Sequence, residues 1–283
     1  MISKRNLNYF IALLFSCLPM AAKSQYSEAG MMLGVSGYKG ELSHSLFNTH
    51  FFHPAAGVFY RHNWNRHWSY RVGGNIGKIS GDDAKSNDPY EVNRNLSFFS
   101  TIWEVYGKFE FNFFPYETGK DGFRFSPYLH FGLALFHFNP KATLNGEDYE
   151  LQPLATEGQG MNGIETYKRL KLSLPIGGGL KFSFGQFGMS LEVSARRAYS
   201  DYVDDVSTVY PDLAELAAIH GPVAAALSDR SLLSPDPATA VYPGKQRGNP
   251  EDNDWYMFAG ITVFVRLNSL TKDSCLPFKT RQY

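Results

Sequence analysis

Hydrophobic and polar residues alternate most regularly between Phe99 and Phe113. Every second position from the start of this segment is apolar or small, including Trp103, Val105 and Phe109, whereas most positions between them carry polar or charged groups such as Glu104. A period of two residues is that of a β-strand, whose successive side chains point to opposite faces. The segment therefore predicts a strand with one apolar face and one charged face.

The same alternation recurs in seven further segments. It is clear in residues 124–138, 169–184, 187–199 and 255–267, and weaker in residues 28–38, 55–64 and 67–78. A tilted strand needs about 9 to 11 residues to cross a bilayer, and each segment is long enough. The chain is therefore predicted to be all-β, with eight strands.

Short and long connections alternate between these strands. The short ones are residues 65–67, 115–122 and 185–186, and the long ones are residues 39–53, 80–95, 140–167 and 200–252. Antiparallel strands place all the short connections at one end, as in outer-membrane barrels with short periplasmic turns and long outer loops. We predict an eight-stranded antiparallel transmembrane β-barrel in the outer membrane of a Gram-negative bacterium, with both termini in the periplasm.

Alternation alone leaves a second fold open. A soluble barrel or sandwich has the same period, but its apolar face points inward. Aromatic residues near predicted strand ends, among them Trp64, Trp68 and Trp255, favour the membrane barrel, in which such residues form girdles at the lipid–water interface. An export signal at the start of the chain favours it too.

The first 24 residues have the pattern of a secretory signal peptide. A basic pair precedes an apolar run, and we place cleavage after Ser24. Lipoprotein processing at Cys17 is the alternative, because the preceding residues loosely resemble a lipobox. Residues 25–267 then form the barrel and residues 268–283 a periplasmic tail. Once Cys17 is removed, Cys275 in that tail has no partner for an internal disulfide.

Charge and composition argue against several functions. Lys plus Arg equals Asp plus Glu at 27 each, so no net charge attracts nucleic acid. Past the signal peptide, no stretch has the roughly 18 consecutive apolar residues of a membrane-spanning helix. Any membrane crossing must therefore use strands. We expect no nucleic acid, no small-molecule substrate and no cofactor.

In the predicted barrel, the charged face of each strand points into a narrow lumen. Eight strands leave room for side chains and little else, and an unpaired buried charge costs on the order of several kcal/mol. We therefore expect these charges to pair and form a plug, with a proton or ion path as the alternative. The predicted network comprises Arg61, Arg71, Glu104, Lys108, Glu110, Arg124, Lys171, Lys181, Glu192, Arg196 and Arg266.

Three aspartates, Asp201, Asp204 and Asp205, stand where the seventh strand enters the longest outer loop. Their spacing lacks the alternate-position rhythm and the turn glycine of a calcium loop, so we predict no metal site from it, and metal binding is kept as an alternative. We expect the aspartates to accept hydrogen bonds from backbone amides or to pair with basic residues such as Arg169 or Arg247. A solvated start of the loop is the alternative.

Two short helices are predicted within the same loop, residues 200–252. Pro211 and Pro222 suit the first turn of a helix, and Gly221 between them suits a helix end. We expect the pair to fold over the mouth of the barrel.

Five segments resemble a known family of outer-membrane barrels. They are RNLSFFSTIWEV, FNFFPY, FSPYLHFGLALFHFNPKA, ELQPLATEGQG and SDYVDDVSTVYPD. The loop from HFNPKA to TEGQG and the box DYVDDVSTVY are the most specific of these elements. Together they resemble the PorG-like family of barrels associated with the type IX secretion system. The likeness covers about residues 28–212 and the last strand, and residues 213–252 lie outside it.

The resemblance implies a structural or anchoring role in protein secretion. Barrels of that family associate with a periplasmic ring made by a lipoprotein and its partner, which the resemblance implies as partners besides outer-membrane lipid. With both termini in the periplasm, the ring can reach only the short turns and the tail. The apolar and basic tail residues that would dock it are Leu270, Lys272, Leu276, Phe278, Lys279 and Arg281. A paralogue with another scaffolding task remains an alternative.

Two other classes of function are weighed against this one. A hydrolase at the outer rim would need a serine or aspartate near a histidine, and a pore would need an open lumen that eight strands do not provide. Candidate hydrolase residues on the outer loops match no catalytic motif; they are His44, His50, His53, His220, Ser43, Ser45 and Asp201. We therefore expect neither an enzyme nor a pore.

Overall fold

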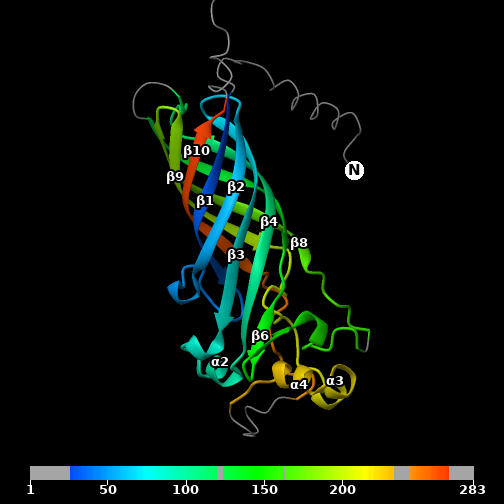
Figure 1. Cartoon of the computed structure of the whole chain (residues 1–283). Helices are drawn as coiled ribbons and strands as arrows, with labels where there is room; N and C mark the ends of the chain where they lie inside the picture. The colour runs from blue at the N-terminus through cyan, green and yellow to red at the C-terminus, as the bar shows by residue number, and fades with distance from the viewer. Residues whose placement is uncertain (1–25, 120–123, 162, 233–241, 268–283) are drawn as a thin grey trace, which may run out of the picture.

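The computed structural model describes residues 26–119, 124–161, 163–232 and 242–267. The predicted signal peptide and tail lie outside the described residues. Eight long strands dominate the structure (Figure 1), and each strand predicted from the alternation is present. Their bounds are β1 Tyr26–Lys39, β2 His53–Asn63, β3 Trp68–Asp82, β4 Ser97–Asn112, β5 Arg124–His137, β8 Leu170–Phe184, β9 Phe187–Ala198 and β10 Trp255–Arg266.

The eight strands close into a barrel by antiparallel pairing. Strands adjacent in the chain pair with each other, β5 pairs with β8, and β1 pairs with β10 from Glu28 opposite Arg266 to Lys39 opposite Trp255. A closed sheet has no unpaired edge, which is the condition under which strands can cross a bilayer. The predicted antiparallel eight-stranded barrel is confirmed.

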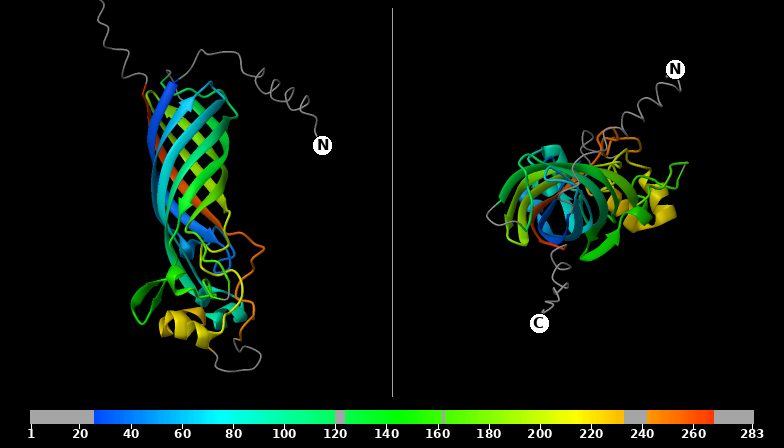
Figure 2. Two further views of the ribbon diagram at one scale, coloured as in Figure 1. Left: turned by 90° about the vertical axis from the view of Figure 1, so that its right-hand side faces the viewer. Right: turned by 90° about the horizontal axis from the view of Figure 1, so that it is seen from above.

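Connections of different length lie at opposite ends of the barrel (Figures 1 and 2). The described residues of three connections, 64–67, 113–119 and 185–186, lie at one end, called the short-turn end. The first described strand begins and the last one ends there. The described residues of the other connections, 40–52, 83–96, 138–161, 163–169, 199–232 and 242–254, gather at the other, the long-loop end. The predicted segregation of connections is confirmed.

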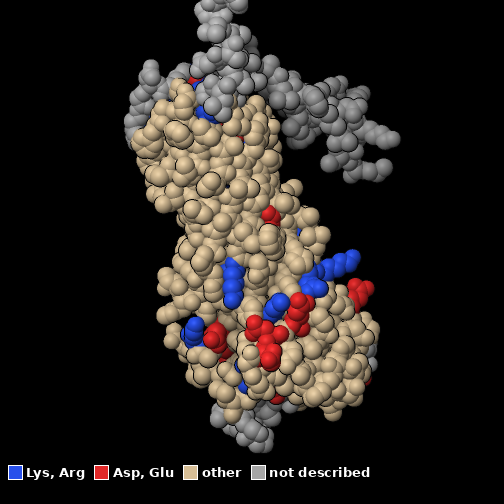
Figure 3. Space-filling model, viewed as in Figure 1, with Lys and Arg blue, Asp and Glu red and all other residues tan. Residues whose placement is uncertain are grey.

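The two faces of the barrel wall differ in polarity. Halfway along β4, Val105 is 62% exposed on the outside, whereas its neighbour Glu104 is 3% exposed on the inside. The outer wall between the short-turn end and mid-barrel shows almost no charged side chains in Figure 3, and charges gather toward the long-loop end. An apolar exterior around a polar interior is the arrangement of a transmembrane barrel, not of a soluble one. Among the described residues, no helix is both long and apolar enough to span a membrane.

The interior has two parts. Charged side chains fill the lumen from the short-turn end to mid-barrel, and the site below is built from them. Aromatic and aliphatic side chains fill the remainder, including Tyr38, Phe98, Ile102, Phe136 and Phe258. The ring centroids of Phe136 and Tyr256 lie 4.9 Å apart at the boundary between these parts. The long-loop end of the lumen is therefore closed by a hydrophobic core.

The long loops carry the remaining elements. A hairpin in the β5–β8 connection was not predicted, and its first strand extends the sheet by pairing Lys141 with Phe99 of β4. Asn145 and Gly146 at its tip both have positive φ, the geometry that an Asn-Gly hairpin turn requires. The elements are η1 Thr49–Phe51, η2 Asp83–Lys85, α2 Pro89–Arg94, β6 Lys141–Leu144, β7 Glu147–Glu150, η3 Gln152–Leu154, α3 Leu213–His220 and α4 Pro222–Ser228.

The two predicted helices, α3 and α4, are both present. The first begins after Asp212, whose carboxylate caps the amides of residues 214 and 215, and not at Pro211. Leu216 and Ala224 pack together with Met161 of the β5–β8 connection, and Leu227 joins the main core. The pair thus covers a neighbouring loop and reaches the barrel core only through α4.

Candidate functional site

Eight of the eleven predicted lumen residues lie together inside the barrel. Inward-facing positions of five strands, β2, β3, β4, β8 and β9, bring them there, because alternation places every second side chain in the lumen. Each is at most 8% exposed; ion pairs connect six of them, and Glu104 and Arg196 form a separate pair beside this set. The eight residues are Arg61, Arg71, Glu104, Lys108, Glu110, Lys181, Glu192 and Arg196.

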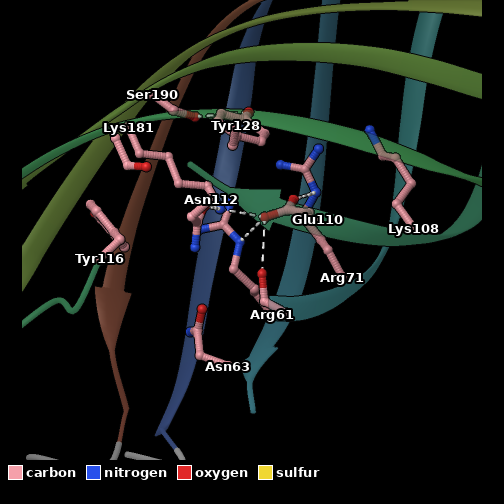
Figure 4. A network of polar contacts seen from close by, with 12 residues as sticks. Arg61, Asn63, Arg71, Lys108, Glu110, Asn112, Tyr116, Tyr128, Lys181 and Ser190 are labelled. Atoms are coloured by element: carbon pink, nitrogen blue, oxygen red, sulfur yellow. Dashed lines mark hydrogen bonds and ion pairs between the residues drawn. The ribbon is translucent and has the colours of Figure 1, made fainter. Parts of the chain in front are cut away.

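Glu110 of β4 lies at the centre of this charge network (Figure 4). Its carboxylate lies 2.8 Å from Arg61 Nε, 3.1 Å from Arg71 Nε and 2.6 Å from Lys181 Nζ. One anion therefore neutralises parts of three cations from β2, β3 and β8. Lys181 also donates to Asn112 Oδ1 at 2.8 Å.

Glu28 of β1 belongs to the network, although the sequence did not single it out. Its carboxylate lies 2.8 Å from Arg61 Nη1 and accepts a 2.5 Å hydrogen bond from the Thr118 hydroxyl. Glu28 is separated from the buried Tyr26 and Met32 by an even number of positions, so its side chain points into the lumen as theirs do. This spacing, in a strand that alternates weakly, is the signal that could have identified Glu28 as a lumen residue.

Two more carboxylates lie toward mid-barrel, one in the connected network and one in the separate pair. Glu192 lies 2.5 Å from Arg71 Nη2 and 2.9 Å from Lys108 Nζ, and it accepts a 2.6 Å hydrogen bond from Tyr128. Glu104 pairs with Arg196 at 2.9 Å and accepts from Tyr256 at 2.9 Å. Five cations thus face four carboxylates within the lumen.

Aromatic rings and packing complete the plug. The Arg61 guanidinium lies 4.6 Å from the ring centroid of Phe264, and that of Arg71 lies 4.8 Å from Phe59. Such cation–π contacts stabilise desolvated guanidinium groups. A cavity beside Arg71, Tyr106 and Glu192 measures about 10 Å³, roughly the space of one water molecule. The described part of the lumen is filled with paired side chains.

Three predicted lumen residues do not join this set. Arg124 and Lys171 are half-buried near the starts of β5 and β8, outside the network of described ion pairs. Arg266 lies at the end of β10, donates to the Thr118 carbonyl at 2.5 Å and lies 3.6 Å from Glu117. These positions lie near the ends of their strands, where side chains leave the lumen.

The aspartates at the start of the β9–β10 loop are buried, so the solvated alternative is wrong. Asp204 accepts hydrogen bonds from the Val206 amide at 2.9 Å and from the Tyr38 hydroxyl at 2.6 Å. Burial raises the pKa of the Asp204 carboxyl to about 7. Asp205 accepts from the hydroxyls of Thr156 and Tyr167. Backbone and hydroxyl donors, not cations, hold these two side chains.

The basic residues expected to pair with the aspartates pair elsewhere. Arg247 lies 2.9 Å from Glu157 and donates to the Asp205 carbonyl at 2.5 Å. Glu157 also accepts from the amides of residues 207 and 208. Arg169 pairs with Glu150 at 3.0 Å. Arg247 and Glu157 therefore fix the loop through its backbone.

Among the described residues, one acidic group could hold a metal ion, and Asp201 is the member of the aspartate cluster that belongs to it. Carboxylate oxygens of Glu41, Asp201 and Asp254 lie within 4.8 Å of one another at the long-loop end. The three come from separate segments, so the spacing within residues 201–205 could not reveal the group.

The candidate hydrolase residues form no catalytic triad among the described residues. His44 Nε2 lies 2.7 Å from Glu91, and His53 Nε2 lies 2.7 Å from the Ser80 hydroxyl. These are separate pairs, whereas a serine hydrolase needs one histidine between a serine and a carboxylate. The six predicted docking residues, Leu270 to Arg281, lie outside the described residues.

The closed antiparallel wall, apolar exterior and paired lumen charges define a small transmembrane β-barrel with a plugged interior. Its sequence matches the family described as a domain of unknown function, DUF6089, over residues 4–220, and the chain belongs to that family. No curated protein sequence matches the chain.

Solved outer-membrane barrels show a loose structural likeness. One is Ail, the attachment invasion locus protein of Yersinia pestis, solved in complex with the heparin analogue sucrose octasulfate. It is 13% identical in sequence to this chain, with a TM-score of 0.37, and the match covers 86% of this chain and 99% of Ail. The N-terminal barrel domain of Pseudomonas aeruginosa OprF has 11% identity and a TM-score of 0.35, covering 87% and 100%. Neisserial surface protein A has 8% identity and a TM-score of 0.39, covering 88% and 100%.

Proposed function

We propose that this protein is a structural component of the type IX protein secretion machinery, which it anchors in the outer membrane. The resemblance of five segments to the PorG-like family supports the secretion role. The observation that carries the structural role is the plugged lumen, in which Glu110 alone contacts three cations. A barrel filled in this way acts as a membrane-embedded platform and not as a conduit.

The short-turn end is the proposed docking face for the periplasmic ring. Part of the second turn folds back into the lumen, where Tyr116 and Thr118 are at most 1% exposed and Tyr116 donates to the Phe182 carbonyl at 3.2 Å. Glu117 in the same turn lies 3.2 Å from Arg66 of the first turn. These contacts fix the described part of the second turn, so we assign the main docking contacts to the tail.

Deletion of residues 272–283 tests the docking face while leaving β10 intact. We expect the barrel to insert normally but to lose co-purification with the ring lipoprotein and its partner, and secretion to fall. Replacing Asn145 to Glu147 at the tip of the β6–β7 hairpin with glycine and serine is the control, because that tip lies at the opposite end. Full association and secretion after the tail deletion would exclude the tail as the docking segment. Unchanged secretion after removal of the whole protein would exclude the secretion role.

The native cysteine of the tail reports the orientation of the barrel. If the tail is periplasmic, a membrane-impermeant maleimide will not label Cys275 in intact cells and will label it after the outer membrane is permeabilised. A Cys275→Ser protein carrying Ala226→Cys, on the exposed side of α4, should label in intact cells. The reverse labelling pattern would place the long loops in the periplasm. Bilayer recordings of the purified barrel should show no large steady conductance.

A further inference from the structure

Three carboxylates from distant segments meet at the long-loop end. Glu41 follows β1, Asp201 follows β9 and Asp254 immediately precedes β10. Because β1, β10 and β9 are adjacent in the sheet, their ends bring these residues to one place. Ligand oxygens of the three lie within 4.8 Å of one another. The group therefore links the β1–β2 loop to both ends of the β9–β10 loop.

The side chain of Asp201 is buried without a hydrogen-bond partner. It is 8% exposed, and neither carboxylate oxygen accepts a hydrogen bond from a described residue. The Ser207 hydroxyl is near enough to lower the pKa of Asp201 but is outside hydrogen-bonding geometry. Glu41 Oε2 is likewise unpartnered, while Glu41 Oε1 accepts a 3.3 Å hydrogen bond from the Asn249 amide. A buried carboxylate normally has such donors, so these oxygens lack their usual compensation.

Neighbouring groups do not supply the missing positive charge. The Tyr38 hydroxyl lies 2.6 Å from Asp204 and 2.8 Å from Asp254, but it has one proton and can donate to only one of them at a time. Among the described ion pairs, the nearby cation Arg94 is bound to Asp83, and Arg247 is bound to Glu157.

Mutual repulsion and burial act on the same carboxyls. Burial, reinforced by Asp204 and Asp201, raises the pKa of Glu41 to about 9. Burial also raises the pKa of Asp201 to about 8, with Asp204, Glu157 and Asp252 contributing. Carboxylates that are close together and shielded from water repel one another, and a bound cation would offset that repulsion.

We propose that Glu41, Asp201 and Asp254 form a binding site for a hard divalent cation, with calcium preferred. Carboxylate oxygens are the ligands of calcium and magnesium, whereas zinc sites usually include nitrogen or sulfur. Calcium–oxygen distances are about 2.3 to 2.6 Å, so ligands on opposite sides of the ion are about 4.8 Å apart. Magnesium needs oxygens at about 2.1 Å and therefore a tighter group.

Gly40 shows how closely the chain is built around this site. A Cβ placed at Gly40 would lie 2.0 Å from Asp254 Oδ1 and 1.9 Å from the Tyr38 hydroxyl. Only a residue without a side chain lets the β1–β2 loop approach Asp254 so closely. The bound cation would hold the long β9–β10 loop to the barrel rim at both of its ends. This inference is independent of the proposed role in secretion.

Calcium titration of the purified full barrel in detergent tests the site. We expect one saturable calcium site with a Kd of about 0.1 to 1 mM, the range of extracellular calcium modules, and at least tenfold weaker binding of magnesium. Asp201→Asn and Glu41→Gln should each weaken calcium binding at least tenfold. Glu147→Gln, an exposed change at the start of β7, should leave it unchanged.

Thermal unfolding separates a cation site from a merely structural cluster. In EDTA, Asp201→Asn should unfold at the same temperature as the wild type or a higher one, because it removes one repelling carboxyl. Calcium should raise the Tm of the wild type and of Glu147→Gln but not that of Asp201→Asn. Absence of saturable calcium binding below about 10 mM, equal binding by the variants, or equally tight magnesium binding would each overturn the proposal.

Discussion

Replacing Glu110 with glutamine removes the anion shared by three buried cations. Arg61 keeps Glu28 at 2.8 Å and Arg71 keeps Glu192, whereas Lys181 keeps only the neutral Asn112 oxygen at 2.8 Å. The excess of cations over carboxylates in the network rises from one to two. Breaking a buried pair from one side costs about 3–5 kcal/mol, because the remaining charge stays desolvated. We expect Glu110→Gln to lower the free energy of unfolding by about that amount.

Equilibrium unfolding in urea, with the barrel in lipid vesicles and intrinsic tryptophan fluorescence as the signal, measures this loss. Glu147→Gln is the control, since an exposed glutamate should change stability by no more than about 0.5 kcal/mol. Adding Lys181→Met to Glu110→Gln removes the stranded cation and should recover about 1–3 kcal/mol. The reasoning is refuted if Glu110→Gln and Glu147→Gln unfold alike, or if the double variant loses the sum of its two single changes.

Three further predictions concern the wall and the long-loop end. Val105→Arg, at an outer position halfway along β4, should cost about 2–4 kcal/mol in lipid, and wild-type stability there would contradict a lipid-facing wall. Burial raises the pKa of Asp205 from 3.8 to about 6, so its stabilising contribution is full below about pH 4 and is lost as the pH rises through about 6. Between about pH 4 and pH 6, the free energy of unfolding of the wild type should therefore fall by up to about 3 kcal/mol relative to that of Asp205→Asn. Equal pH dependence of the two free energies would refute this. Arg247→Met leaves Glu157 without its cation, so limited proteolysis should cut residues 205–254 faster while the barrel stays intact; an unchanged cleavage rate would show that Arg247 does not fix the loop.

The barrel could be predicted because each signal for it lies within a single segment of the sequence. Alternation along each strand determines which face is apolar, and the lengths of the connections determine which end they occupy. Asn145 and Gly146 are an equally local signal for a hairpin turn, although the hairpin was not predicted. Glu28 was not predicted as a lumen residue because its strand alternates weakly, although its spacing from Tyr26 and Met32 places it on the inward face.

The loop cluster was not predictable in this way. Glu41 and Asp254 are brought together by the pairing of β1 with β10, which joins opposite ends of the chain. No periodicity or spacing within one segment encodes such a contact. The pairing of Arg247 with Glu157, and not with an aspartate, likewise depends on how two long loops pack against each other.

The lumen charges also constrain how the protein can be assembled. The ion pairs of the lumen join side chains from β1, β2, β3, β4, β8 and β9. No single hairpin therefore contains all the partners. A partly inserted sheet would expose these groups to lipid unless water accompanied them. The pairs of Glu192 with Arg71 and Lys108 join β9 to β3 and β4 across the lumen, so they form only as the sheet curls toward closure. Insertion intermediates of this barrel therefore need a hydrated, laterally shielded environment until β10 has joined β1.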